Sequence, residues 1–277
     1  MNYTSIPIIS FAVIIGLGGC SLLPPAEHVT TPEATHSFVL AGEGSPTVIL
    51  ESGLGDGKDS WVPVFSQIAE ETRVFAYDRA GYGVSKSGSK ARDGSTIARE
   101  LRATLRALNV RPPYVLVGHS IGGTYMELYA RTYPEDVAGV VLVDSRHADF
   151  TRQCQIADAG SCTPPALLSA LLPPGPKREM AAGDKTMEQV MNSGPFPNVP
   201  LSVVTGGKQF LVRARFYEVW LETQKSLATL SSDSTHMVCK RCGHYVHKDN
   251  PKLVVDAVTS VIGRANVGRR NAGPLPP

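Results

Sequence analysis

Short apolar runs rich in Val, Ile and Leu recur along the chain, separated by longer stretches of mixed apolar and polar residues. Near-continuous apolar runs of this length are typical of parallel strands that are buried on both faces. They predict strands at His36–Leu40, Val48–Glu51, Val74–Tyr77, Tyr114–Gly118, Val140–Asp144, Leu201–Thr205 and His236–Cys239.

The stretches between these runs predict helices. In Ser95–Leu108 the apolar residues recur at helical spacing, with arginines on the opposite face. The final helix opens at Asn250-Pro251, an N-cap residue followed by proline at the first helical position. We expect the core to close at residue 264, before a disordered tail over 265–277. Alternating strands and helices predict an α/β fold with a doubly wound, mostly parallel sheet.

Residues 145–200 interrupt the alternation, because no strand is predicted there and eight of the 21 prolines fall within them. A long insertion in a compact domain is usually functional. We interpret it as a lid over the carboxyl ends of the strands, inserted between core segments 36–144 and 201–264. A surface loop is the alternative, but four leucines favour a lid that buries apolar surface: Leu167, Leu168, Leu171 and Leu172.

The amino terminus has the pattern of an export signal. Residues 6–19 are apolar or small apart from Ser10, a stretch too short to span a bilayer but suited to a signal peptide over 1–19. It ends in Leu17-Gly18-Gly19-Cys20, which resembles a bacterial lipobox. We therefore expect a lipid anchor on Cys20, a proline-containing linker over 20–35, and a place in the cell envelope, at the outer membrane facing the periplasm. An ordinary signal peptide, with secretion and an unmodified Cys20, is the alternative.

The other four cysteines form two close pairs, Cys154 with Cys162 and Cys239 with Cys242. An exported protein meets an oxidising compartment, so we expect two local disulfides, although the sequence leaves pairing between the two clusters open. The spacings do not match a usual zinc pattern, and we predict no metal site. A net charge of +2 without a dense Lys/Arg run argues against a nucleic-acid partner.

The strongest chemical signal is Gly118-His119-Ser120-Ile121-Gly122, a G-x-S-x-G motif. A predicted strand precedes it and a predicted helix over Thr124–Thr132 follows, which is the setting that a nucleophile elbow requires. A Gly/Ser loop of no catalytic role is the alternative. We predict that Ser120 is the nucleophile of a serine hydrolase.

With this motif in its setting, residues 36–264 resemble the α/β-hydrolase family. Leu50–Gly55 resembles the family's loop after the third strand, and Arg73–Ser85 resembles its stretch around the fourth strand. The resemblance implies the α/β-hydrolase fold, with the backbone N–H groups of Leu54 and Ile121 as an oxyanion hole. It also implies that Asp78 and Arg79 are scaffold residues.

The base should come late in the chain, because the family's order is Ser, acid, His. His244 follows the last predicted strand and resembles the family's base, and His247 is the fallback. A Cys239–Cys242 disulfide would stiffen the loop that carries His244.

The acid departs from the commonest family pattern, because no carboxylate directly follows the strand Leu201–Thr205. Some members carry the acid one strand earlier, where Asp144 ends its strand. We expect Asp144 to orient the imidazole, with three alternatives left open: Asp149, Asp233 and Glu218.

These residues predict hydrolysis of a small-molecule carboxylic ester through an acyl-enzyme, without a cofactor. The same machinery serves amides, lactones, thioesters and carbon–carbon bonds. A serine at the elbow argues against epoxide hydrolases and haloalkane dehalogenases, which use aspartate there. A non-catalytic envelope lipoprotein is the alternative from another class.

Overall fold

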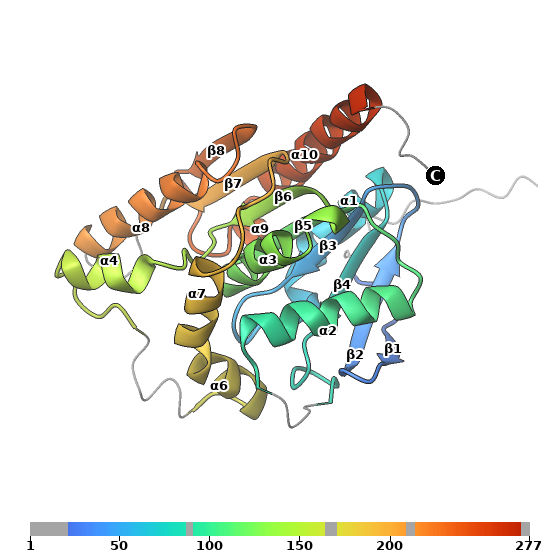
Figure 1. Ribbon diagram of the computed structural model, residues 1–277, viewed down its shortest axis with the longest axis horizontal. Helices are drawn as coiled ribbons and strands as arrows, with labels where there is room; N and C mark the ends of the chain where they lie inside the picture. Colours follow the sequence, from blue (N-terminus) through green and yellow to red (C-terminus); the bar gives the residue numbers. More distant parts are fainter. Residues whose placement is uncertain (1–21, 87–90, 164–170, 209–213, 273–277) are drawn as a thin grey trace, which may run out of the picture.

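A computed structural model describes residues 22–86, 91–163, 171–208 and 214–272. Its centre is an eight-stranded sheet in the order β1-β2-β4-β3-β5-β6-β7-β8 (Figure 1). Pairs from β4 to β8 are parallel, and β2 joins β1 and β4 in antiparallel register. The strands are β1 (Glu27–Thr30), β2 (Thr35–Ala41), β3 (Thr47–Glu51), β4 (Val74–Asp78), β5 (Tyr114–His119), β6 (Val137–Val143), β7 (Leu201–Gly206) and β8 (Ser234–Cys239).

The structure confirms the predicted doubly wound α/β architecture, in which strands alternate with helices. The helices are α1 (Val62–Glu71), α2 (Gly94–Ala107), α3 (Ile121–Thr132), α4 (Phe150–Ile156), α6 (Pro174–Ala181), α7 (Gly183–Met191), α8 (Ala214–Leu227), α9 (Val246–Asp249) and α10 (Pro251–Ala272). Short 3-10 turns cover Lys58–Trp61 and Pro134–Asp136.

Successive residues of the central strands enter two separate cores. Val48 and Leu50 pack with α1 and α10 on one face, whereas Ile49 between them packs with α2 and α3 on the other. Because side chains alternate across a strand, a strand covered on both faces must be apolar at every position. This burial accounts for the continuous apolar runs in the sequence.

The 145–200 insertion contributes α4, α6 and α7. Helix α4 lies against α8, and α7 lies against α2 and α3, so the insertion contacts the core at two separate places (Figure 1). Of the four leucines that favoured a lid, Leu167 and Leu168 lie outside the described residues, and Leu171 is 75% exposed.

Two expected boundaries are wrong. The segment 20–35, expected as a linker, contains β1, because the chain turns at Thr31 and pairs back on β2, extending the sheet by one strand. The final helix continues to Ala272 rather than ending near residue 264, since Gly263 is accommodated within it and Ala265 is buried. Glycine lowers helix propensity without forcing an end when tertiary packing supports the helix.

The expected signal peptide and Cys20 lie outside the described residues. Within the described part of the chain, no helix is both long enough and apolar enough to cross a membrane.

Candidate active site

Ser120 occupies a sharp turn between β5 and α3. Its φ of 55° and ψ of −125° lie in a region that non-glycine residues rarely adopt. The turn is held against the end of β6, because Ser120 N–H donates to the Val143 carbonyl at 3.1 Å and the Ser120 carbonyl accepts from Arg146 N–H at 3.0 Å. The surrounding structure therefore maintains a strained nucleophile-elbow conformation.

The two outer glycines of the motif are required by close backbone contacts. A Cβ atom on Gly122 would lie 2.5 Å from the carbonyl oxygens of Glu51 and Ser52, and one on Gly118 would lie 2.5 Å from the Gly123 Cα. Both distances are far below van der Waals contact, so a larger residue at either position would displace the turn.

The structure brings Asp144 and His244 together. Their Oδ2 and Nδ1 atoms lie 2.7 Å apart, with the Asp144 side chain 5% exposed and the His244 side chain 43% exposed. The other carboxylate oxygen accepts hydrogen bonds from Gly206 N–H and Trp220 Nε1, each at 3.0 Å. These two donors hold the Asp144 carboxylate in one orientation and leave Oδ2 for the imidazole of His244.

Trp220 is a site residue that the sequence does not reveal. It belongs to α8, and its ring packs 5.0 Å from that of Phe150 on α4 of the insertion. The insertion therefore supports the indole that binds Asp144. Nothing in the local sequence around Trp220 distinguishes it from a tryptophan that only fills a core.

The last residue of β7, Gly206, has no room for a side chain. A side chain on Gly206 would collide with the carbonyl group of Gly243, one residue before His244. The Gly206 N–H instead supports Asp144 from the neighbouring strand. The end of β7 thus assists the carboxylate without supplying it.

The loop that carries His244 is fixed at three points. The cysteines 239 and 242 form a disulfide, and Gly243 N–H donates to Asp249 Oδ2 at 2.7 Å. His119 Nε2 lies 3.0 Å from the His244 carbonyl. Because burial, followed by the charges of His244 and His247, lowers the pKa of His119 well below its usual value, His119 is neutral and donates this bond through Nε2.

The residues considered as an alternative base or acid have other partners and do not belong to the Asp144–His244 pair. His247 is fully buried, bonded to Ser60 Oγ at 3.0 Å, and burial lowers its pKa to about 3. Glu218 pairs with Arg215 on the exposed surface of α8. The remaining two carboxylates form ion pairs as well, Asp149 with Arg152 and Asp233 with Arg264.

The expected oxyanion groups lie on the other side of Ser120. Leu54 and Ile121 line a cavity of about 480 Å³ together with Ser120. Ile121 is the first residue of α3, and the first N–H groups of a helix have no partner within it. The positive end of the helix dipole favours negative charge at this place.

Arg79 holds the loop that leads to Leu54. Its Nη1 and Nη2 donate to the carbonyl oxygens of Ser52 and Gly53 at 2.7 and 2.8 Å. Its guanidinium also pairs with Glu51 at 2.5 Å and with Glu179 at 3.0 Å. Glu179 belongs to α6, so one buried side chain connects the insertion to the loop expected to carry an oxyanion donor.

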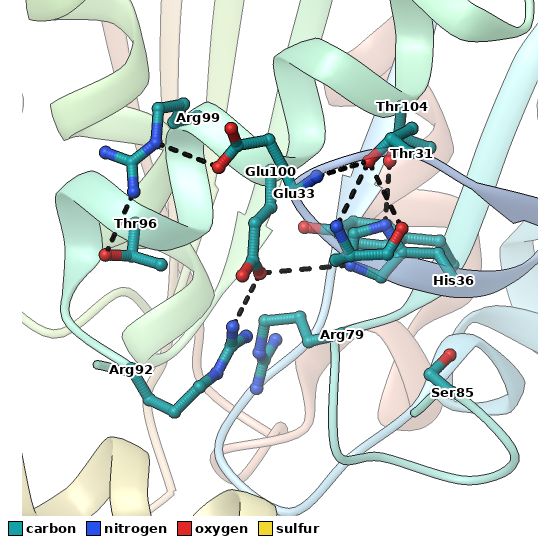
Figure 2. Close-up of polar contacts among 12 residues, drawn as sticks. Thr31, Glu33, His36, Arg79, Ser85, Arg92, Thr96, Arg99, Glu100 and Thr104 are labelled. Atoms are coloured by element: carbon teal, nitrogen blue, oxygen red, sulfur yellow. Dashed lines mark hydrogen bonds and ion pairs between the residues drawn. The ribbon is translucent and has the colours of Figure 1, made fainter. Parts of the chain in front are cut away.

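The buried charges continue from Glu179 to α2. Arg92 lies 3.5 Å from Glu179 and 2.5 Å from Glu100. Figure 2 shows the Glu100 carboxylate between Arg92 and His36, with Arg79 beside Arg92. His36 bonds to Thr104 Oγ1 at 2.8 Å, and burial, aided by Arg92, lowers its pKa to about 3. The network joins α2, α6 and the strands β2 to β4.

Two cavities meet at Ser120. The larger one is lined on its insertion side by Met180 and Met187. The smaller one, of about 330 Å³, is lined by Asp144 and His244 with the aromatic residues Phe216, Tyr217 and Trp220. Ser120 and Arg146 line both.

The cysteines of the insertion also form their predicted local pair, Cys154–Cys162. This disulfide lies in a small apolar cluster with Phe150 and Val219, between α4 and α8. Among the described residues, no group of three or more His, Cys, Asp or Glu side chains could hold a metal ion.

Comparisons with known proteins agree with this architecture. A model of the alpha/beta hydrolase fold family matches residues 46–167. Together with the sheet order and the elbow, this match shows that the chain has the alpha/beta hydrolase fold.

Among relatives, the Bacillus subtilis protein YqjL is 28% identical over 242 residues, which cover 82% of this chain and 88% of YqjL. A thermophilic esterase from Thermogutta terrifontis superposes with a TM-score of 0.65 at 18% identity, covering 87% of this chain and 99% of the esterase. Carboxylesterase CesB from Bacillus subtilis gives 0.61 at 18% identity, covering 87% and 92%. Structures of similar fold also include an epoxide hydrolase and a haloalkane dehalogenase, so the fold alone does not select a reaction.

Proposed function

We propose that this protein is a serine hydrolase of carboxylic esters, with Ser120 as nucleophile, His244 as base and Asp144 as the acid that orients it. The single observation that carries the proposal is the 2.7 Å contact between His244 Nδ1 and Asp144 Oδ2 beside a cavity that Ser120 also lines. A hydrogen bond from Nδ1–H to a carboxylate leaves Nε2 unprotonated and able to accept a proton.

In the first half-reaction, His244 Nε2 takes the Ser120 hydroxyl proton as Oγ bonds to the ester carbon. The carbonyl oxygen gains the negative charge, which the N–H groups of Leu54 and Ile121 stabilise. As the carbon–oxygen bond to the leaving group breaks, His244 returns the proton and the alcohol departs. Water then repeats the sequence on the acyl-enzyme, giving the carboxylic acid and free Ser120.

An active-site-directed fluorophosphonate tests the nucleophile. We expect the wild-type protein to form one adduct on Ser120, and Ser120→Ala to form none and to lose hydrolysis of short acyl esters. Labelling of Ser120→Ala to the wild-type extent would contradict the assignment. A panel of matched esters, amides, lactones and thioesters then tests the bond type, and faster turnover of any other class would replace the ester proposal.

We also infer that the protein is anchored to the cell envelope through a lipid on Cys20. The support is the apolar stretch 6–19 directly before a cysteine with small neighbours. Cys20→Ser should move the protein from the membrane fraction to the soluble fraction. Unchanged membrane retention would remove the anchor from the proposal.

A further inference from the structure

Arg146 is a cation placed at the junction of the two cavities that meet at Ser120. Its backbone is fixed on both sides: its N–H donates to the Ser120 carbonyl at 3.0 Å, and its carbonyl accepts from Thr124 Oγ1 at 2.6 Å. The guanidinium lies 5.2 Å from the Phe150 ring, and Nη2 donates to Thr151 Oγ1 at 2.5 Å. The cation therefore has a defined position relative to the nucleophile.

The charge of Arg146 is not paired within the described residues. No carboxylate there lies at ion-pair distance from it, and Thr151 accepts from only one of its five guanidinium N–H donors. The charge of Asp184 acts on the guanidinium from farther away, but burial outweighs this attraction and lowers the pKa of Arg146. Withdrawing an unpaired charge from water is unfavourable, so a site of this kind gains free energy when an anion binds.

The smaller cavity combines two cationic side chains, Arg146 and Lys208, with an aromatic wall. Phe216, Tyr217 and Trp220 line it, and the carboxylate that lines it, Asp144, is already bonded to His244. The cavity suits an aromatic or apolar group that carries one negative charge. A guanidinium matches a carboxylate in a planar, two-point contact.

The chemistry of the proposed reaction decides which half of the substrate enters this cavity. His244 must reach the leaving oxygen to protonate it, so the alcohol half lies on the His244 side. The oxyanion donors Leu54 and Ile121 line the larger cavity, whose Met180 and Met187 suit an acyl chain.

We propose that Arg146 binds a carboxylate on the alcohol half of the ester, making esters of carboxylate-bearing, aromatic or apolar alcohols the preferred substrate class. This inference rests on the proposed serine hydrolase function.

The test compares 4-carboxyphenyl butanoate with its neutral counterpart, 4-carbamoylphenyl butanoate. The measured quantity is the ratio of their kcat/KM values in each variant, because the intrinsic reactivity of the two leaving groups cancels when the ratios are compared. We expect Arg146→Met to lower this ratio about 10-fold to 100-fold, as for loss of a hydrogen bond to a charged group. Arg146→Lys should restore part of it.

Arg152→Met is the matched control, because this nearby arginine pairs with Asp149 on the surface and lines neither cavity. Its ratio should equal that of the wild type. An unchanged ratio in Arg146→Met would overturn the anion proposal while leaving the hydrolase proposal intact. Absence of turnover of both esters together with absence of fluorophosphonate labelling would overturn both.

A measurement on the wild-type protein covers the case in which Arg146→Met does not fold. Benzoate should slow the labelling of Ser120 by the fluorophosphonate much more than benzamide does, and added salt should weaken the effect of benzoate. Equal protection by the two compounds would contradict a role of Arg146 in binding an anion.

Discussion

The two sides of Ser120 are built from different interactions. On the Arg79 side, the loop 52–54 is fixed by a buried guanidinium that lies between the carboxylates of Glu51 and Glu179. On the His244 side, the orientation of the imidazole depends on a few hydrogen bonds and a short disulfide loop. Charge pairs that share buried partners are costly to break singly, so the Arg79 side should affect folding. The His244 side should affect reactivity more than folding.

Asp144→Asn should produce the largest change in activity. The oxygen of the substituted side chain can still accept from Gly206 N–H and Trp220 Nε1, but its amide nitrogen cannot accept the His244 Nδ1 proton. The imidazole is then held in the wrong tautomer, and we expect kcat to fall about 10³-fold to 10⁴-fold. Steady-state kinetics with a short acyl ester would measure this fall, with Glu218→Gln as the control at near wild-type activity. Activity of Asp144→Asn close to that of the wild type would transfer the acid role to another residue.

Arg79→Met should produce the largest change in stability. Glu51 and Glu179 would remain buried without their common cation, and we expect the free energy of unfolding to decrease by about 3–5 kcal/mol. Urea unfolding followed by circular dichroism would measure the loss. Arg99→Met is the matched control, because Arg99 pairs with Glu33 at the surface of α2 and should leave the midpoint nearly unchanged. Equal decreases in the free energy of unfolding of the two variants would mean that the buried ion pairs of Arg79 stabilise the fold no more than a surface ion pair does.

Removal of the Cys239–Cys242 disulfide should separate activity from stability. The closed loop contains few residues, so Cys239→Ser with Cys242→Ser should cost at most about 2 kcal/mol of unfolding free energy. The His244 loop would sample more orientations, and kcat/KM should fall several-fold. Replacing Cys154 and Cys162 by serine, measured in the same way, is the comparison, since that pair lies between α4 and α8. A larger activity loss from this second pair would contradict the role given to the His244 loop.

The stability of the protein should depend on pH through two buried histidines, His36 on the Arg79 side of Ser120 and His247 on the His244 side. The pKa of His36 and that of His247 are each lowered to about 3 by burial in the folded protein. Between about pH 6.5 and pH 3 the unfolded chain therefore binds more protons, so their contribution to stability is complete above pH 6.5 and decreases with acidification.

Each histidine should contribute a slope of at most about 1.4 kcal/mol per pH unit in this range. His36→Asn can keep the bond to Thr104, and His247→Gln can keep the bond to Ser60. Urea unfolding at a series of pH values should show a flatter acid limb in each variant, and the double variant should be flatter still. If the unfolding free energy of both single variants falls with acidification as steeply as that of the wild type, other groups are responsible for the pH dependence.

Sequence patterns predict the elements near the site because those signals are local. Apolar runs predict seven of the strands. The glycines around Ser120 predict the turn, because neighbouring backbone leaves no room for larger residues there. The position of His244 follows from chain order. Asp144 could be proposed as the acid because it lies at the end of a predicted strand next to that of Ser120, and parallel register places the two at one edge of the sheet.

The features that escaped prediction depend on partners distant in the chain. Arg79 and Glu179 are 100 residues apart, and Trp220 reaches Asp144 across 76 residues. No periodicity or local motif encodes such pairs. The strand β1 escaped for a different reason: the prolines around it indicate a linker, although its backbone pairs with β2 at the sheet edge.

The place of β8 in the sheet has a consequence for how the protein should lose activity. Ser120 follows the central strand β5, whereas His244 follows β8, which among the described residues pairs with β7 alone. Outer strands with exposed side chains open in local fluctuations that leave the rest of a domain folded. Fraying of β8 would separate His244 from Asp144 while the elbow and the Arg79 network remain formed. In mild denaturant, hydrolysis should therefore cease before the core unfolds, and amide hydrogen exchange should be faster along β8 than along β5.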